Sequence, residues 1–193
     1  MINTGIQSLL TRRSVKFVQQ PGPSDDELDQ ILRAAMCAPD HGRLRPWRFS
    51  LIRGDAILEL AEFATAESRK AGIEISKAKE ATTRKWLEQV PLLIAVACYI
   101  DPENTRIPEI ERVLTTGASV INILNATHML GYAAYWSTGL GTYVPSVNEA
   151  LGYPAPDYRF MGYVSIGTPL RDAPDLPRPD YNDFISNWTG LPS

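Results

Sequence analysis

Two arginines, a serine and a lysine lie close together near the start of the sequence. Arg12, Arg13, Ser14 and Lys16 are interrupted only by Val15. Guanidinium groups form paired, charge-assisted hydrogen bonds with phosphate oxygens, and a hydroxyl adds a neutral donor. In an extended segment Arg12, Ser14 and Lys16 share one side. The pattern suits a phosphate, although cations that follow a helix also stabilise its C-terminal dipole without any ligand.

A second group of polar residues occupies a loop after the expected second helix. Asp40, His41 and Arg45 fall between Pro39 and a Pro-Trp pair. Loops of this kind often present charged groups to a ligand. The alternative is an ordinary surface turn, with Trp47 in the core.

Hydroxyl groups follow a third segment, which spans residues 131–139. Ser137 and Thr138 come directly after Trp136 at the end of an expected strand, where ligands often bind. The alternative is a capped helix followed by a plain strand. The Gly-Leu-Gly tripeptide at 139–141 lacks the third glycine and the long helix of a dinucleotide fingerprint, so we expect no Rossmann site.

Composition limits the classes of protein that need to be considered. The chain has 193 residues, of which 44% are hydrophobic and 21% charged. These are globular proportions and predict one domain over residues 1–193. The net charge of −3 argues against a nucleic-acid partner or an anionic membrane surface.

Cysteine and histidine spacing predicts neither a disulfide framework nor a metal site. The two cysteines are Cys37 and Cys98, and the two histidines, His41 and His128, lie far apart. The apolar run over residues 92–98 is too short to span a bilayer, and the N-terminus does not resemble a signal peptide. We therefore expect a cytoplasmic protein.

Helical and strand patterns are mixed along the chain, which predicts a single α+β domain. A Ser24–Glu27 capping box begins the second helix. A helix over 108–130 is apolar almost all round, so it should be buried on more than one side, in a core or against a partner. The segment 168–193 is rich in proline yet carries aromatic residues, and we interpret it as an arm that docks on a second subunit. The other expected helices cover 4–13, 55–88 (interrupted near 72) and 145–151, and the strands 47–53, 91–100, 132–138 and 158–166.

Taken together, these segments resemble the nitroreductase family, especially its small single-domain YdjA-like branch. That family has Arg-Arg-Ser-x-Arg/Lys after the first helix and a loop that ends in Gln-Pro-Trp-Arg-Phe. It also has a long small-residue helix before a Trp-x-Ser/Thr-Gly strand, and a final Ile-Gly-x-Pro turn. The corresponding segments here are 12–16, 38–49, 131–139 and 166–169, in the same order.

The resemblance implies a mixed sheet flanked by helices, in an intertwined homodimer that binds FMN at its interface. Arg12, Arg13 and Ser14 would hold the phosphate and ribityl end, and Lys16 would approach the N1/O2 edge of the flavin. The second segment would add Cys37, Asp40, His41 (across the interface) and Arg45. Trp136, Ser137 and Thr138 would complete the site from the partner subunit.

The chain departs from the family pattern at some of these positions. Arg45 replaces the glutamine of the family loop, and Cys37 stands where the branch has an arginine. Arg171 and Arg178 are both candidates for a further phosphate contact found in some relatives.

The implied activity is electron transfer through the flavin, with no catalytic side chain required. NADH or NADPH would give a hydride to the flavin and leave before a nitroaromatic, quinone or enone acceptor binds, in a ping-pong cycle. Lys16 would stabilise the negative charge of the reduced flavin. The alternatives are a flavin carrier or sensor without turnover, a flavin-destroying or dehalogenating relative with residues 55–88 as a lid, and a structural dimer without cofactor.

Overall fold

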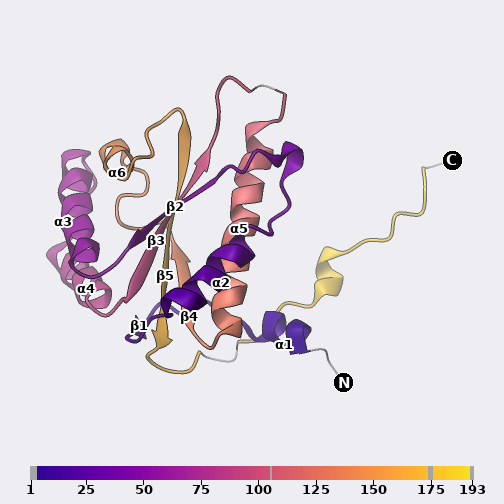
Figure 1. The fold of residues 1–193 in the computed structure, drawn as a ribbon, viewed down its shortest axis with the longest axis horizontal. Helices are drawn as coiled ribbons and strands as arrows, with labels where there is room; N and C mark the ends of the chain where they lie inside the picture. The colour runs from indigo at the N-terminus through magenta and orange to yellow at the C-terminus, as the bar shows by residue number, and fades with distance from the viewer. Residues whose placement is uncertain (1–3, 105, 174–175, 192–193) are drawn as a thin grey trace.

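A β-sheet lies between two layers of helices in this computed structural model, which describes residues 4–104, 106–173 and 176–191 (Figure 1). Helices α3 (Asp55–Lys70) and α4 (Lys77–Leu87) cover one face of the sheet. Helices α2 (Asp25–Ala35) and α5 (Glu109–Met129) cover the other. The helix expected over 55–88 is therefore a pair, interrupted near residue 72 as the glycine predicted.

The sheet is antiparallel throughout the part of the chain that the structure describes. The order is β1-β5-β3-β2, and β4 also pairs with β5. The expectation of a mixed sheet is wrong in this respect, because β5 runs opposite to every strand that pairs with it, and β3 runs opposite to β2. The strands are β1 (Val18–Gln19), β2 (Trp47–Ile52), β3 (Leu92–Tyr99), β4 (Ala133–Ser137) and β5 (Tyr158–Pro169).

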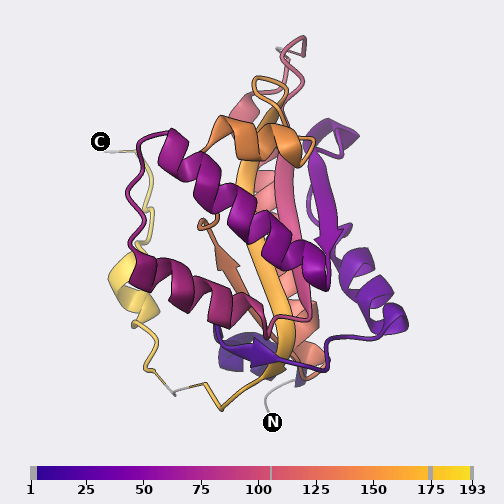
Figure 2. The same cartoon turned by 90° about the vertical axis from the view of Figure 1, so that its left-hand side faces the viewer.

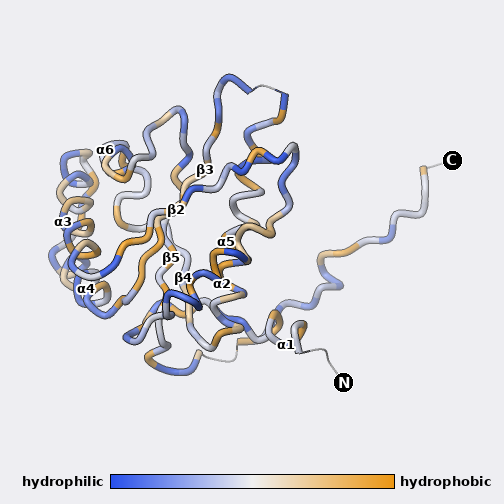
Figure 3. Tube along the Cα trace, viewed as in Figure 1, coloured by the Kyte–Doolittle hydropathy of each residue, from blue (hydrophilic) through white to orange (hydrophobic). Residues whose placement is uncertain are grey.

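Strand β3 forms the centre of the hydrophobic core, as its continuous apolar sequence predicted. Successive side chains point to opposite faces of a sheet. Leu93, Ala95 and Ala97 pack with α3 and α4, whereas Leu92, Ile94 and Val96 pack with α2 and α5. Figure 3 shows this apolar centre between more polar helices. Each face of β3 thus holds one helical layer in place.

Helix α2 begins where the sequence predicts. The Ser24 hydroxyl accepts the Glu27 N–H, and the Glu27 carboxylate accepts the Ser24 N–H at 2.8 Å. The same carboxylate accepts the Tyr132 hydroxyl at 2.9 Å, just before β4. The capping box therefore also anchors the start of β4.

The two ends of the chain lie outside this three-layered body. Helix α1 (Thr4–Thr11) buries none of its residues. Residues 168–169, expected as the start of the arm, instead extend β5 because they pair with β1. Beyond them, residues 176–191 run away from the body past a short helical turn, Tyr181–Phe184 (Figures 1 and 2). Residues 174–175 and 192–193 of the expected arm lie outside the described residues.

A glycine permits strand β4 to end where it does. Gly162 has a φ of 94° and lies at an irregularity in the β3–β5 pairing. A Cβ atom at this position would lie 2.3 Å from the carbonyl oxygen of Ser137, which belongs to the third segment identified from the sequence. Only glycine combines this φ with such a close approach of two backbones.

We predict that Gly162→Ala destabilises the protein more than Gly152→Ala. Gly152 also has a positive φ, 82°, but a Cβ atom there meets nothing within 4 Å. The control should lower the free energy of unfolding by about 1 kcal/mol. Gly162→Ala should cost about 1–3 kcal/mol more, because β4 must shift. Urea denaturation measures both, and equal losses would contradict the proposed contact.

Candidate functional site

A backbone hydrogen bond joins the first and third segments identified from the sequence. The N–H of Val15 donates to the carbonyl oxygen of Ala134 at 3.0 Å. Residues 12–16 therefore run beside β4, and cavities open along both segments. Lys16 lines a cavity of about 740 Å³ together with Ser137 and Thr138 of the same chain, although the resemblance assigned these two residues to the partner subunit.

Helices α3 and α4 form the opposite wall of this large cavity. The wall includes Ser68 from α3, Lys79 and Glu80 from α4, and Ile73 from the connection between them. Glu80 accepts a hydrogen bond from Arg69 at 2.5 Å, which ties α4 to the end of α3. Residues 55–88, to which the sequence assigned no definite role, thus bound the cavity.

Trp86 fixes the position of Lys16. The Lys16 ammonium nitrogen lies 4.7 Å from the centre of the Trp86 ring, a cation–π contact. The Trp86 indole N–H also donates to the Lys16 carbonyl oxygen at 2.8 Å. Trp86 was not among the residues predicted from the sequence, although a single tryptophan in the polar helix α4 could have indicated a functional contact.

The aromatic residues of β4 have different roles. Tyr135 lines the cavity and packs edge-on against Trp86, with ring centres 6.5 Å apart. Trp136 also lines the cavity, but its indole N–H donates to the Met161 carbonyl oxygen at 2.9 Å and its ring packs with the α2 and α5 core. The Trp136 side chain is thus a core residue, as expected for a side chain next along the strand.

A smaller cavity of about 200 Å³ continues along the same segments toward α1. Arg12, Arg13, His128 and Asp172 line it. The Arg12 Nη1 atom is buried, and no hydrogen-bond partner for it is found within the described ranges of the chain. A buried guanidinium nitrogen without a partner is unfavourable, and an anion would satisfy it.

The C-terminal segment brings another cation to this small cavity. Arg178 donates to the Arg12 carbonyl oxygen at 2.5 Å, and Arg13 donates to the Leu176 carbonyl oxygen at 3.2 Å. By contrast, the Arg171 guanidinium lies 6.0 Å from the centre of the Phe17 ring. Arg178 rather than Arg171 is therefore next to the predicted phosphate residues.

The pKa values around the small cavity record an excess of positive charge. Burial lowers the pKa of Arg12, and repulsion by Arg178 and Arg13 lowers it further. Burial also lowers the pKa of His128, with a further contribution from the Arg12 charge. Because both shifts oppose protonation, a phosphate group would suit this pocket electrostatically.

The second segment lies elsewhere in the molecule. The Asp40 carboxylate accepts the backbone N–H groups of Leu44 and Arg45, at 3.1 and 2.8 Å. Asp40 therefore stabilises its own loop. Cys37, His41 and Arg45 are all exposed, and none of them lines either cavity described above.

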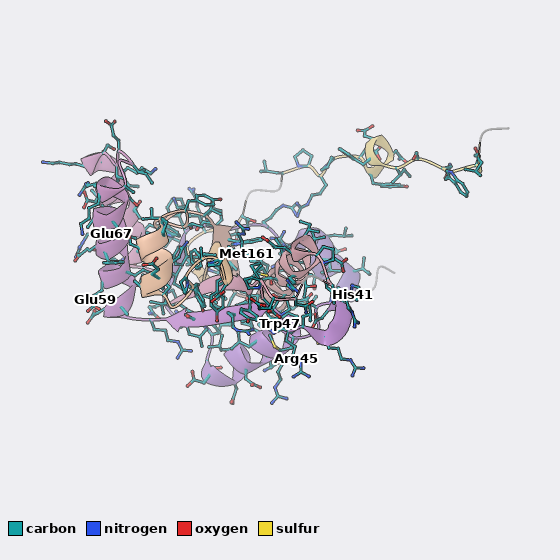
Figure 4. The ribbon with its side chains drawn as sticks, turned by 90° about the horizontal axis from the view of Figure 1, so that it is seen from above. His41, Arg45, Trp47, Glu59, Glu67 and Met161 are labelled. Carbon is teal, nitrogen blue, oxygen red and sulfur yellow. The ribbon has the colours of Figure 1, made fainter. Side chains whose placement is uncertain are left out.

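Helix α5 separates the two groups of predicted residues. His41 contacts Glu111 in the first turn of α5, whereas Thr11 contacts His128 in its last turn. At about 1.5 Å per residue, these contacts lie about 25 Å apart along the helix. Figure 4 likewise places His41 and Glu67, a residue of α3, on opposite sides of the molecule. One chain does not bring all the predicted residues together.

Within residues 4–104, 106–173 and 176–191, no three His, Cys, Asp or Glu residues are grouped as a metal ion would require. Over those same ranges, no helix has both the length and the apolar character needed to cross a lipid bilayer.

Comparison with known sequences identifies relatives over nearly the whole chain. The sequence model described as "Nitroreductase family" matches residues 9–168. The chain is 32% identical over 188 residues to NAD(P)H nitroreductase YdjA of Escherichia coli strain K12, covering 94% of this chain and 97% of that protein. It is 26% identical over 189 residues to iodotyrosine deiodinase of Danio rerio, covering 90% of this chain and 63% of the deiodinase.

Solved structures share the fold. A nitroreductase-like family protein from Bacillus cereus aligns with a TM-score of 0.81 at 21% identity, over 98% of each chain. A nitroreductase from Desulfovibrio desulfuricans, solved in complex with FMN, aligns with a TM-score of 0.74 at 21% identity, over 98% of this chain and 100% of that one.

We predict that NMR titration finds the pKa of His128 below the value of about 6.5 that is typical of an unperturbed imidazole. Arg12→Met should raise this pKa, because it removes the positive charge that opposes protonation of His128. The chain has only two histidines, so His41→Gln assigns the signals. A His128 pKa that ignores Arg12→Met would contradict the electrostatic contact.

Proposed function

This chain belongs to the nitroreductase family, and from that premise we propose that it is an FMN-dependent oxidoreductase that carries electrons from NADH or NADPH to a small organic acceptor. One observation carries the proposal. A small cationic cavity and a large aromatic cavity follow one another along residues 12–16 and β4. FMN has the matching parts, a phosphate at one end and a planar ring at the other.

The phosphate end of FMN fits the small cavity. Arg12 Nη1, for which the described residues provide no hydrogen-bond partner, supplies a buried donor. Arg13 and Ser14 follow Arg12 in the sequence. We assign the additional phosphate contact to Arg178, since its guanidinium already lies against Arg12. A bound phosphate would reduce the repulsion that Arg12 experiences from Arg13 and Arg178.

The ring end fits the large cavity, where Lys16, Ser137 and Thr138 supply the polar groups. When bound, the flavin ring accepts a hydride from the nicotinamide and passes electrons to the acceptor. The Lys16 ammonium, held over Trp86, would stabilise negative charge on the ring.

Donor and acceptor would use the same large cavity in turn. Its volume of about 740 Å³ accommodates one planar ring stacked on another, and the nicotinamide and the acceptor would both need the same exposed face of the flavin. Initial rates should therefore show the parallel double-reciprocal lines of a ping-pong mechanism. A nitroaromatic, a quinone or an enone is small and flat enough to be the acceptor.

A second copy of the chain would complete the site. The exposed face of α5 carries Ile110, Leu114 and Ile121, which are 59%, 64% and 45% exposed, and Gly117 lies between them with open space before it. Such a stripe suits packing against another helix. If two α5 helices cross in opposite directions, the start of each lies near the end of the other. Cys37, His41 and Arg45 of one copy then approach the cavities of its partner.

The C-terminal arm supports the same homodimer. Four large apolar side chains of the arm are between 61% and 81% exposed: Tyr181, Phe184, Ile185 and Trp188. So much exposure is unusual for large apolar side chains this close together in the sequence. Their burial against a second copy would provide the hydrophobic contribution that the arm lacks within its own chain.

A dehalogenase is the second candidate, because iodotyrosine deiodinase is among the relatives. The α3–α4 wall would then act as the lid over a halophenol. Iodide release from an iodophenol under reducing conditions distinguishes this activity from nitro or quinone reduction.

The first test is an absorbance spectrum of the purified protein, followed by anaerobic addition of NADH or NADPH. We expect the spectrum of bound oxidised flavin and bleaching by the preferred nicotinamide. Lys16→Ala should retain FMN but slow bleaching about 100-fold, because it removes a charge that stabilises the reduced ring. Lys85→Ala, which removes an exposed lysine of α4 that does not line the cavity, is the control.

Each outcome of this test is informative. A protein that neither contains nor takes up FMN would overturn the proposed function. A yellow protein that no nicotinamide bleaches would be a flavin carrier or sensor instead. Equal bleaching rates for Lys16→Ala and wild type would remove the role assigned to Lys16.

We further predict that Leu114→Lys yields a monomer with weakened FMN binding, because a buried lysine would disfavour the α5 contact. Leu51→Lys is the matched control, since Leu51 is also an exposed leucine, 45%, but on β2. Light scattering gives the mass and fluorescence titration gives the FMN affinity. A dimeric Leu114→Lys variant would place the interface elsewhere.

A further inference from the structure

A carboxylate–imidazole pair lies at the start of α5, far from the large cavity beside Lys16 and the small cavity beside Arg12. His41 Nδ1 is 2.5 Å from Glu111 Oε2. The His41 side chain is 66% exposed and that of Glu111 is 39% exposed. The pair therefore lies at the surface, where most ion pairs contribute little to stability.

The loop around His41 is held without any help from this pair. Asp40 binds the two backbone N–H groups at the end of the loop. Thr115 Oγ1 donates to the Pro39 carbonyl oxygen at 3.0 Å, which attaches the loop to α5. A Cβ atom on Gly42 would lie 2.6 Å from Ile107 Cδ1, so the loop also packs closely on its other side. The bond from Glu111 consequently restricts the imidazole ring rather than the backbone.

A bond to Nδ1 decides what the other ring nitrogen does. A carboxylate can only accept, so the proton of a neutral His41 ring resides on Nδ1. Nε2 is then an acceptor, and it lies on the side of the ring opposite Glu111. An oriented, exposed acceptor is the arrangement that binds an N–H or O–H group of a ligand.

We propose that Glu111 is a positioning residue, which orients His41 so that Nε2 accepts a hydrogen bond from FMN held in the cavities of a second copy. This inference rests on the proposed function, which brings His41 of one copy to the cofactor of the other. Glu111 itself touches no cofactor, and it acts only through the imidazole. The flavin ring has one N–H and the ribityl chain has hydroxyls, so FMN offers suitable donors.

A double-mutant cycle tests this dependence. FMN affinity is measured by fluorescence titration of the apoprotein dimer for wild type, His41→Ala, Glu111→Ala and the double variant. Removal of a residue that orients a ligand-binding histidine typically weakens binding about 10-fold or more. We expect each single variant to lose about 10-fold, and the double variant to lose no more than His41→Ala alone.

Two further variants separate positioning from a structural role. Glu111→Gln still offers an oxygen to the Nδ1 proton, so it should restore most of the affinity lost in Glu111→Ala. Glu109→Ala removes a neighbouring glutamate of the same helix, paired with Arg159 at 2.5 Å, and should leave FMN affinity unchanged.

The outcomes distinguish this inference from the function on which it rests. A wild-type protein that fails to bind FMN overturns both. If wild type binds FMN, additive losses in the cycle overturn the role of Glu111 alone. Dissociation of the Glu111→Ala dimer, measured by light scattering, would also overturn it, because Glu111 would then stabilise the assembly instead.

Discussion

The pairing of β4 with β5 is the contact on which the site depends. Strand β5 pairs with β3 on one side and with β4 on the other. The end of β4 occupies the space that a Cβ atom on Gly162 of β5 would need, so only glycine permits this close approach. Strand β4 in turn receives the N–H of Val15, which places residues 12–16 along the cavities. Strands β4 and β5 thus connect residues 12–16, to which we assign contacts with FMN, to the buried centre of the sheet. Rigid placement of this kind is what a tightly bound cofactor requires.

Helix α5 contacts both groups of predicted site residues and also keeps them apart. One end of the helix contacts the residues near Arg12, and the other end contacts the loop that carries His41. A helix of 21 residues cannot bring its two ends together, so one chain holds two incomplete halves of the predicted site. The same helix presents Leu114 and its apolar neighbours outward. The proposed second copy, packed in the opposite direction, would account for both the separation and the exposed stripe.

Local patterns in the sequence predicted the elements well and their long-range contacts poorly. The Ser24–Glu27 capping box and the buried strand β3 were correct, because each depends on neighbours in the sequence. Strand β1 was missed, since two residues carry no periodicity. The role of Trp86 required knowing that α4 folds back over Lys16, 70 residues away. The backbone contacts of Asp40 could not be predicted either, because the sequence does not distinguish a carboxylate that binds its own loop from one that faces a ligand. Candidate residues could therefore be named from the sequence, whereas the contacts that each of them makes could not be predicted.

The three arginines around the small cavity repel one another before any ligand is bound. Burial lowers the pKa of Arg12, repulsion by Arg178 and Arg13 lowers it further, and the Asp172 carboxylate lines the same cavity. Arg178 and Leu176 belong to the segment that leads into the aromatic arm. An anion that removes this repulsion would therefore also favour the packing of that segment on the body. By thermodynamic linkage, the supply of flavin in the cell would then influence how readily newly made chains assemble into pairs.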